Sequence, residues 1–310
     1  MRGMDPRRLV LLSEFAERRS ITATATALHL TPSAVSQQLK ALEKEAGAPL
    51  VEPRGRGLEL TALGAALADT AVEIRTALAR ARAVADEHVL GVAGTVRIAM
   101  FPSSAELLLP GAMSMLRERT PSLLIDPVIL DAQESEFARL VPDFDIVLAH
   151  NVSGAGAWMS PSSSTQLLLT EPLDVAVAPD HPLAERDEVS AAELADESWI
   201  SVPHDFPFEH AFTRLERLME QPLTVVARLP DLRTIEALIA TGHGIGLVSR
   251  FTVAADKVRT LRLAEFQPTR QIYALTRAEH ASSPAVRRVL DVLVEAGWEV
   301  ERAVADGAAQ

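Results

Sequence analysis

A helix framed by Thr31-Pro32 and Gly47 constrains the fold more than any other part of the chain. Thr31 is a favoured N-cap, Pro32 suits the first helical position, and Gly47 suits the residue just past a helix C-terminus. Two shorter helical patterns precede it, at about 6–19 and 20–28. A short turn gives the last two helices the spacing of a helix-turn-helix, which lays its second helix in the major groove of DNA.

The helix over 31–46 has two faces of opposite character. The face predicted to be buried consists of Val35, Leu39, Leu42 and Ala46. The opposite face has no acid on its centre line and consists of Ser33, Ser36, Gln37, Lys40 and Lys44. Hydroxyl and amide groups can bond base edges and lysines can meet phosphates, so this face suits the major groove. An ordinary solvent-exposed face is the alternative interpretation.

The segment over 49–61 predicts a two-stranded wing. Gly55 and Gly57 allow a sharp turn at its tip, and the arginines beside them would reach phosphates or a minor groove. Together with the polar helix face, this wing favours DNA binding over the solvent-exposed interpretation. The residues expected to contact DNA are Thr31, Pro32, Ser33, Ser36, Gln37, Lys40, Arg54 and Arg56.

The charge distribution is compatible with DNA contact through the N-terminal part alone. The net charge of the chain is −12, but residues 1–65 carry nine Lys/Arg against seven Asp/Glu. The absence of cysteine excludes disulfides, thiolate metal sites and a cysteine nucleophile. Because the sequence has neither a long apolar run nor a secretory h-region, we expect a cytoplasmic protein with no membrane partner.

A long helix is predicted over 62–90, which contains no proline. Its apolar positions repeat at heptad-like spacing and are Leu67, Ala71, Ile74, Leu78, Ala81 and Ala85. The helix would be about 42 Å long, too long for one face of a small domain. We therefore expect it to pair with a second copy of the chain, the alternative being packing on its own domain. Gly91 and Gly94 end it.

From Thr95 onward, strand and helix patterns alternate, which predicts an α/β fold. We expect two strands, at 166–169 and 174–178, around a turn at Glu171-Pro172, and a closing helix over 284–298. The glycine-rich stretch 242–246 lies between helix and strand, so it lacks the context of a dinucleotide loop. No nucleophile elbow or metal-ligand spacing appears, so we expect no catalytic residues, metal or cofactor.

The N-terminal motif resembles the winged helix-turn-helix of LysR-type transcriptional regulators. The resemblance is carried by Phe15-Ala16-Glu17, Ser20, 23–28, 31–39, Leu42-Glu43, Gly47, Pro49-Leu50, Arg54, Arg56-Gly57, Leu60-Thr61 and Gly64. Three positions depart from the family pattern: Gln37 stands where many members carry Arg, Val51 where Phe is usual, and Pro53 where a wing Arg is common.

The resemblance implies an order of domains. It predicts a winged helix-turn-helix over 1–61, a linker and dimerisation helix over 62–91, and an effector-binding domain over 95–300. This last domain would have two Rossmann-like lobes resembling periplasmic binding proteins. Lobe one would comprise about 95–165 and 267–300, and lobe two about 166–266. The family also implies a homodimer through the linker helix and a homotetramer.

A ligand site is expected between the lobes, because ligands of open α/β folds bind beyond the carboxyl ends of strands. Its expected residues are Phe101, Ser103, Ser104, Ser201, Val202, His204, Phe206 and Thr234. Helix N-capping by Ser103 or Ser104 is the alternative role for these two serines. Such a mixed set admits a small carboxylate or an aromatic acid.

These features together predict a regulator that binds promoter DNA under the control of a small-molecule effector. The alternative is a cytoplasmic small-molecule-binding protein or enzyme whose N-terminal helices serve dimerisation. The polar helix face and the arginine-tipped wing favour the regulator.

Overall fold

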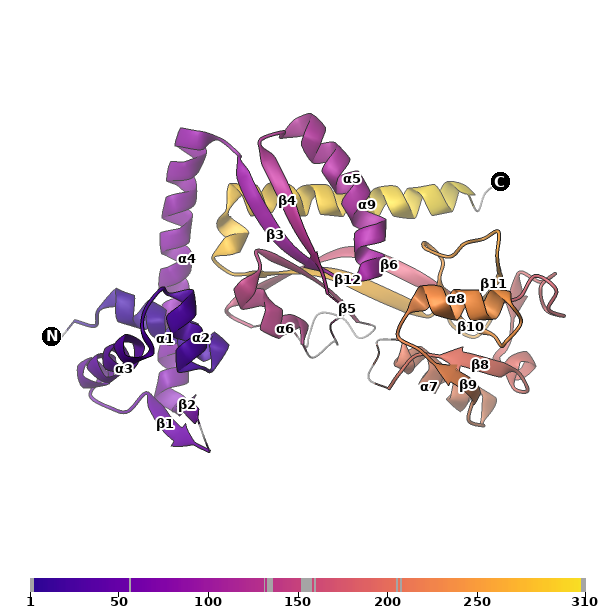
Figure 1. Cartoon of the computed structure of the whole chain (residues 1–310), viewed down its shortest axis with the longest axis horizontal. Helices are drawn as coiled ribbons and strands as arrows, with labels where there is room; N and C mark the ends of the chain where they lie inside the picture. The colour runs from indigo at the N-terminus through magenta and orange to yellow at the C-terminus, as the bar shows by residue number, and fades with distance from the viewer. Residues whose placement is uncertain are drawn as a thin grey trace.

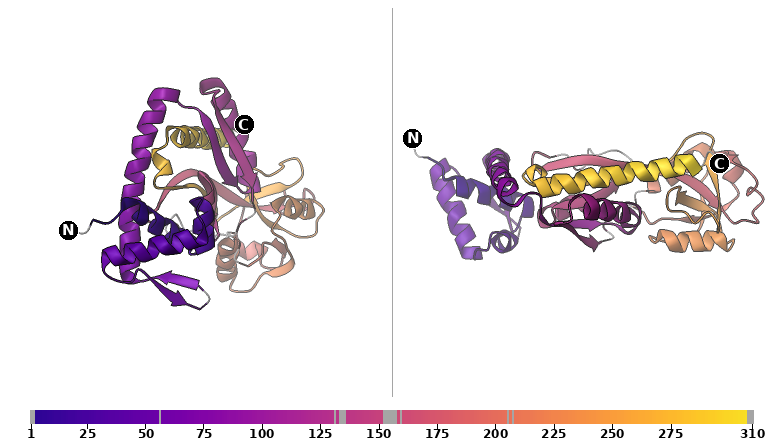
Figure 2. Two further views of the ribbon diagram at one scale, coloured as in Figure 1. Left: turned by 60° about the vertical axis from the view of Figure 1, so that its left-hand side comes forward. Right: turned by 90° about the horizontal axis from the view of Figure 1, so that it is seen from above.

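The protein consists of a head and two lobes arranged in a row, as Figures 1 and 2 show. A computed structural model describes residues 3–55, 57–130, 132, 136–151, 158, 160–204, 206 and 208–307. Head, lobe one and lobe two each have their own cluster of buried apolar side chains. No helix within these described ranges is both long and apolar enough to cross a membrane.

The head is a three-helix unit with a two-stranded wing. Its elements are α1 (Pro6–Arg18), α2 (Ile21–Ala27), α3 (Pro32–Ala46), β1 (Val51–Arg54) and β2 (Gly57–Leu60). The helix ends predicted for α3 are confirmed, because Thr31 Oγ1 accepts from the Ala34 N–H at 3.2 Å and Gly47 is left-handed with φ 78°. Val35, Leu39 and Leu42 are buried, as the pattern predicts.

The long helix α4 (Ala62–Leu90) begins in the head and runs past lobe one. Gly64 is required at its start, since a Cβ there would lie 2.0 Å from the Leu50 carbonyl oxygen. Ala71 is fully buried against the head, and Leu67 and Ile74 also pack there. The expectation that the whole heptad-like seam is free to pair with a second copy is therefore wrong for its N-terminal half, which packs on its own domain. Leu78 is 53% exposed.

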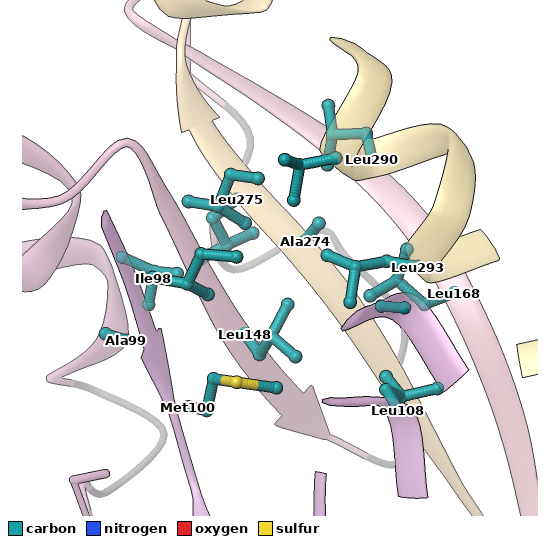
Figure 3. Packing of buried hydrophobic residues seen from close by; sticks show 14 of the residues in the cluster. Ile98, Ala99, Met100, Leu108, Leu148, Leu168, Ala274, Leu275, Leu290 and Leu293 are labelled. Atoms are coloured by element: carbon teal, nitrogen blue, oxygen red, sulfur yellow. The ribbon is translucent and has the colours of Figure 1, made fainter. Parts of the chain in front are cut away.

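Lobe one is a sheet covered by helices. Its elements are β3 (Gly94–Met100), α5 (Pro102–Arg119), β4 (Leu123–Ile129), α6 (Phe137–Leu140), the 3₁₀ turn η1 (Val141–Asp143), β5 (Ile146–Asn151), β12 (Thr269–Arg277), the 3₁₀ turn η4 (His280–Ser282) and α9 (Pro284–Gly307). β3 pairs in parallel with β4 and β5, and β12 is antiparallel to β5. Figure 3 shows side chains such as Ile98, Leu148, Leu275 and Leu293 packed together beneath α9. This last helix continues beyond the expected end at 298.

A single long strand, β6 (Ser163–Val177), connects the two lobes. Its first part pairs with β12, and its last part pairs with β10 (Gly246–Ser249) and β11 (Arg259–Leu263). The predicted turn at Glu171-Pro172 is wrong, because the strand runs straight through it. Pro172 lies where pairing passes from β12 to β10, and its carbonyl accepts from the Arg250 N–H at 3.0 Å.

One β-bulge lies in β6 at Leu168, where the register with β12 shifts. The carbonyl oxygen of Leu168 points at Gly297 of α9, where a Cβ would approach it to 2.3 Å. The glycine thus lets α9 lie directly on the bulged strand.

Lobe two is built around the far half of β6. Besides β10 and β11 it contains β7 (Glu188–Val189), the 3₁₀ turn η3 (Ala191–Leu194), β8 (Ser198–Ser201), α7 (Glu209–Met219), β9 (Thr224–Arg228) and α8 (Leu232–Ala240). β8 and β9 form a separate parallel pair, whose Trp199 is fully buried in the lobe. Because the paired strands β6 and β12 run from one lobe to the other, the space between the lobes lies next to these strands.

Candidate nucleic-acid interface and effector cavity

The outer face of α3 is accessible. Ser33, Gln37 and Lys40 are exposed, and Ser36 is half-buried. The Ser36 hydroxyl donates to the Pro32 carbonyl at 3.0 Å, which leaves its oxygen lone pairs free to accept. The face therefore offers an amide, hydroxyl acceptors and a cation to an approaching duplex, and the burial of Ser36 and Lys40 that would exclude DNA does not occur.

The wing carries an ion pair at its tip. Arg54 Nη1 lies 2.5 Å from Glu59 Oε2 across the β1–β2 pair, and both side chains are exposed. Glu52 faces Glu59 in the register of the two strands. The charge of Arg54 is thus partly compensated within the wing. The other predicted wing contact, Arg56, lies outside the described residues.

A cavity of about 100 Å³ lies between the lobes, at the N-terminus of α5. Its polar and aromatic lining includes Phe101, Ser103, Glu106, His150, Phe206, Asp231, Arg233, Glu236, Ser249 and Arg270. Both lobes contribute, since Phe101, Ser103 and His150 come from lobe one and Asp231, Glu236 and Ser249 from lobe two.

Arg270, which lines the cavity, forms a buried ion pair with Glu171 behind it. Arg270 Nε donates to Glu171 Oε2 at 2.5 Å, and its Nη2 donates to Ser103 Oγ at 3.0 Å. The Ser249 hydroxyl donates to the other carboxylate oxygen of Glu171. The pair is fully hydrogen-bonded on its carboxylate side, as a buried charge requires.

His150 lies beside this pair at the end of β5. The residue is 4% exposed, and its ring lies 4.2 Å from the ring of Phe101 and 5.3 Å from that of Phe137, centre to centre. Burial, and then the nearby charge of Arg270, holds the pKa of His150 well below its ordinary value of 6.5, so the imidazole is neutral. Its Nδ1 has no hydrogen-bond partner among the described residues. It is thus a buried polar atom at the cavity wall to which no described residue donates or accepts a hydrogen bond.

The rim of the cavity is charged but internally paired. Arg233 contacts Glu106 of lobe one and lies 3.4 Å from Glu236. Asp231 accepts from the Thr234 N–H at 2.7 Å as the N-cap of α8, and the hydrogen bond from the Thr234 hydroxyl, followed by this backbone bond, lowers the pKa of Asp231. The Arg233–Glu106 contact joins the lobes across the cavity mouth.

Three of the eight residues expected at this site line the cavity: Phe101, Ser103 and Phe206. The other five do not, and they are Ser104, Ser201, Val202, His204 and Thr234. Ser104 is buried and donates to the Phe101 carbonyl, and Val202 is in the lobe-two core. Ser201 accepts from Arg228 at 3.4 Å, and His204 is exposed beside Glu209. Neither Ser103 nor Ser104 caps α5 with its side chain.

Sequence reasoning missed His150, Glu171, Ser249 and Arg270. The position of His150 at the carboxyl end of a buried apolar strand, which it shares with Phe101, could have predicted it as a cavity residue. No local sequence pattern could have predicted Arg270, since its contact with Glu171 depends on the pairing of two strands about a hundred residues apart in sequence.

Comparison with known families agrees with this geometry. Residues 91–298 match the LysR substrate binding domain, and residues 6–65 match the bacterial regulatory helix-turn-helix proteins of the lysR family. The chain therefore belongs to the LysR family of transcriptional regulators, with a helix-turn-helix DNA-binding domain and an effector-binding domain. This membership confirms the predicted regulator over the alternative of an enzyme. Members of the family bind DNA and small-molecule effectors and form oligomers.

Its relatives are regulators of this kind. The transcriptional dual regulator GltC of Bacillus subtilis is 29% identical over 260 residues, which cover 83% of this chain and 84% of that protein. The regulator CbbR of Xanthobacter flavus is 28% identical over 305 residues, 94% of this chain and 87% of that protein.

Solved structures share the fold. A full-length OxyR variant from Pseudomonas aeruginosa superposes with a TM-score of 0.63 at 18% identity, covering 95% of this chain and 97% of that one. The LysR family regulator CbnR has a TM-score of 0.54 at 19% identity, covering 94% and 100%.

Proposed function

We propose that this regulator senses a small molecule in the cavity between its lobes and reads promoter DNA with α3. Residues 1–61 would form the DNA-binding domain, 62–91 the dimerisation helix, and 95–300 the two-lobed effector domain. The observation that carries the effector site is the buried Arg270, paired with Glu171, which lines one cavity together with Ser103 and His150, whose Nδ1 has no partner among the described residues.

The effector chemistry follows from this lining. Phe101 and Phe206 offer ring faces, while His150 Nδ1 offers a hydrogen bond that no described residue takes. A small planar or ring-containing molecule with a polar group on one edge fits both features, because a ligand that bonds His150 relieves its desolvation. An aromatic acid satisfies this description, with its carboxylate beside Ser103 at the N-terminus of α5.

For DNA, we assign base contacts to Ser36 and Gln37 and a phosphate contact to Lys40. Thr31, Pro32 and Ser33 lie at the N-terminal end of α3, the end that usually approaches the bases. Arg54 and Arg56 would reach the backbone from the wing.

We assign the dimer contact to the C-terminal half of α4. Leu78 and Val84 are 53% and 65% exposed on this helix, although both are large apolar residues, and Ala81 and Ala85 are exposed beside them. This half of the helix has apolar side chains to bury, whereas in the half within the head Ala71 is already buried and Leu67 and Ile74 pack on the head. A tetramer would need additional contacts between effector domains.

A thermal-shift screen with small aromatic acids and other metabolites tests the effector site. A true effector at 100 times its Kd adds about 2.7 kcal/mol of stability, and hence raises the melting temperature by several degrees. This increase should be lost in Ser103→Ala and His150→Phe and retained in Lys40→Ala. A compound whose effect survives both cavity substitutions binds elsewhere, and the assignment of the cavity is then wrong.

A mobility-shift assay with the promoter beside its own gene tests the DNA roles. Lys40→Ala should weaken binding to all sequences and reduce the salt slope by roughly one phosphate. Gln37→Ala should instead change the preferred sequence. If neither change affects operator binding, the assignment of α3 is wrong.

A further inference from the structure

Charged residues form the contact between the head and lobe one. The buried apolar cluster of the head contains no residue of lobe one, and that of lobe one contains no residue of the head. Between them lies a group of five charged side chains, here called the junction cluster: Glu14 and Glu17 of α1, Arg75 of α4, Arg277 at the end of β12, and Glu279 just after it.

The two arginines of the junction cluster each bridge head and body. Arg277 Nη2 lies 2.6 Å from Glu14 Oε2 and 2.7 Å from Glu17 Oε2, both on the head. Arg75, which belongs to α4, contacts Glu17 and lies 2.8 Å from Glu279 Oε1 of the body. In the junction cluster, residues of the head therefore have ion-pair partners on the body, and residues of the body have partners on the head.

Four of the five residues of the junction cluster are buried, and Glu17 is half-buried. Glu14 is 4% exposed, and Arg75, Arg277 and Glu279 are each below a tenth. Its hydrogen bonding is incomplete, because the Nε groups of Arg75 and Arg277 are at ion-pair distance from Glu279 but are not directed at its oxygens. Buried ion pairs of this kind add little net stability but have demanding geometry. The cluster is therefore better suited to fixing an orientation than to adding stability.

A second contact of the same type lies alongside. Arg18 of α1 lies 2.7 Å from Asp143 Oδ1 and donates to the Pro142 carbonyl at 2.9 Å, both in η1 of lobe one. Its Nε also lies 2.6 Å from Glu14, which links this contact to the junction cluster.

Elsewhere, a groove separates α4 from the body. A groove of about 780 Å³ runs beside the junction cluster, lined by Leu78 and Arg82 of α4 and by Ser283 and Pro284 of the body. Among the described residues, the charged contacts therefore oppose a rotation of the head on lobe one, in addition to the covalent link at Gly91.

We propose that the junction cluster is an intramolecular docking surface that fixes the orientation of the DNA-reading head on the effector domain. Its partner is the chain's own body, which presents Arg277 to Glu14 and Glu17 of α1 and Glu279 to Arg75 of α4. Removing one of these side chains breaks ion pairs that cross from head to body, and this frees the head to rotate about the end of α4. This inference does not depend on the identity of the effector or on the cavity being its site.

Distance measurements between spin labels test this proposal in the full-length protein. The chain has no cysteine, so Thr22→Cys on α2 and Glu118→Cys on α5, both exposed, place one label on the head and one on lobe one. Labelled protein is diluted with unlabelled protein to suppress distances between copies. We expect a single narrow distribution, which broadens by about twofold or more in Arg277→Met and in Glu14→Gln.

The matched control is Arg119→Met, which removes an exposed ion pair with Glu295 within lobe one. It should leave the distribution narrow. Circular dichroism establishes that each variant is folded, and Glu14→Gln, the milder change, carries the test if Arg277→Met does not fold. A distribution that stays narrow in a folded junction variant, or that broadens equally in Arg119→Met, overturns the proposal.

Discussion

Arg270 and Glu171 face each other across β12 and β6, at the point where both strands pass from one lobe to the other. Both side chains are buried, and the Arg270 guanidinium also lies 5.1 Å from the ring centre of Phe101 and 5.2 Å from that of Phe208. The charged pair thus lies where the two lobes meet, and one aromatic ring from each lobe lies beside its guanidinium.

Replacing Arg270 by Met should strongly destabilise the protein. The substitution leaves the Glu171 carboxylate buried without its cation, which costs about 3–5 kcal/mol. Denaturant unfolding at neutral pH measures this loss. The double variant Arg270→Met/Glu171→Leu should recover most of it, because no uncompensated charge remains. Equal losses in the single and double variants would mean that packing, and not charge, explains the effect.

Stability should fall in mild acid because of His150. Since its pKa in the folded protein is lowered below 6.5, the unfolded chain takes up a proton that the folded one does not. The neutral His150 contributes its full share to the free energy of unfolding above pH 6.5. This share is lost as the pH falls toward the pKa of His150 in the folded protein, by at most about 1.4 kcal/mol per pH unit. Unfolding measured from pH 8 to pH 5 should show a shallower decline in His150→Phe.

Burial also lowers the pKa of His280, so this residue adds to the loss of stability in acid. Because His280 is present in both proteins, the difference between wild type and His150→Phe reports His150 alone. The exposed His210 provides the control, and His210→Gln should follow the wild-type profile. A His150→Phe profile parallel to wild type would contradict the assignment of a buried neutral imidazole.

Glu59→Gln should strengthen DNA binding. The change frees Arg54, whose partner in the wing is Glu59, to meet a phosphate. Titrations at several salt concentrations should show higher affinity and a salt slope steeper by roughly 0.9, the value for one added phosphate contact. In an Arg54→Ala background the same substitution should have a much smaller effect. An equal gain in both backgrounds would point to general charge reduction instead.

Leu78→Glu should reduce the mass of the protein in solution, by placing a charge in the apolar half of α4 assigned to the dimer contact. Light scattering after size exclusion measures that mass. Val226→Glu, at a similarly exposed position on β9, should leave the assembly intact. Unchanged mass in Leu78→Glu would place the dimer contact elsewhere.

Gly297→Ala should destabilise lobe one by about 1–3 kcal/mol, the cost of overpacking. The added Cβ would lie 2.3 Å from the Leu168 carbonyl oxygen, which is backbone in a bulge and has little room to move. Gly111→Ala offers a graded comparison, because its nearest neighbour is the Ala296 side chain at 3.3 Å. A larger loss at Gly111 would contradict this ranking.

Local signals predicted the head well. The ends of α3 depend on Thr31, Pro32 and Gly47 alone, and α4 spans 62–90 as its uninterrupted helical pattern indicates. The family resemblance supplied the two-lobed architecture that strand patterns alone left open.

Contacts distant in sequence explain what sequence reasoning missed. Pro172 was expected in a turn, yet β12 and β10 keep its strand extended by pairing on either side of it. Ser201 and Val202 were placed at the cavity because their strand ends there, but they face the lobe-two core and Arg228. The face that a strand presents depends on its twist and its neighbours, which composition does not reveal.

The strand β12 carries Arg270 at the cavity and Arg277 at the head. Seven residues of extended backbone separate them, roughly 23 Å at 3.3 Å per residue. β12 pairs with β5 on one side and with β6 on the other, so hydrogen bonds on both sides keep it extended. The distance between the cavity arginine and the head arginine is therefore set by one extended segment of backbone, so that two distant sites of the molecule share a single structural element.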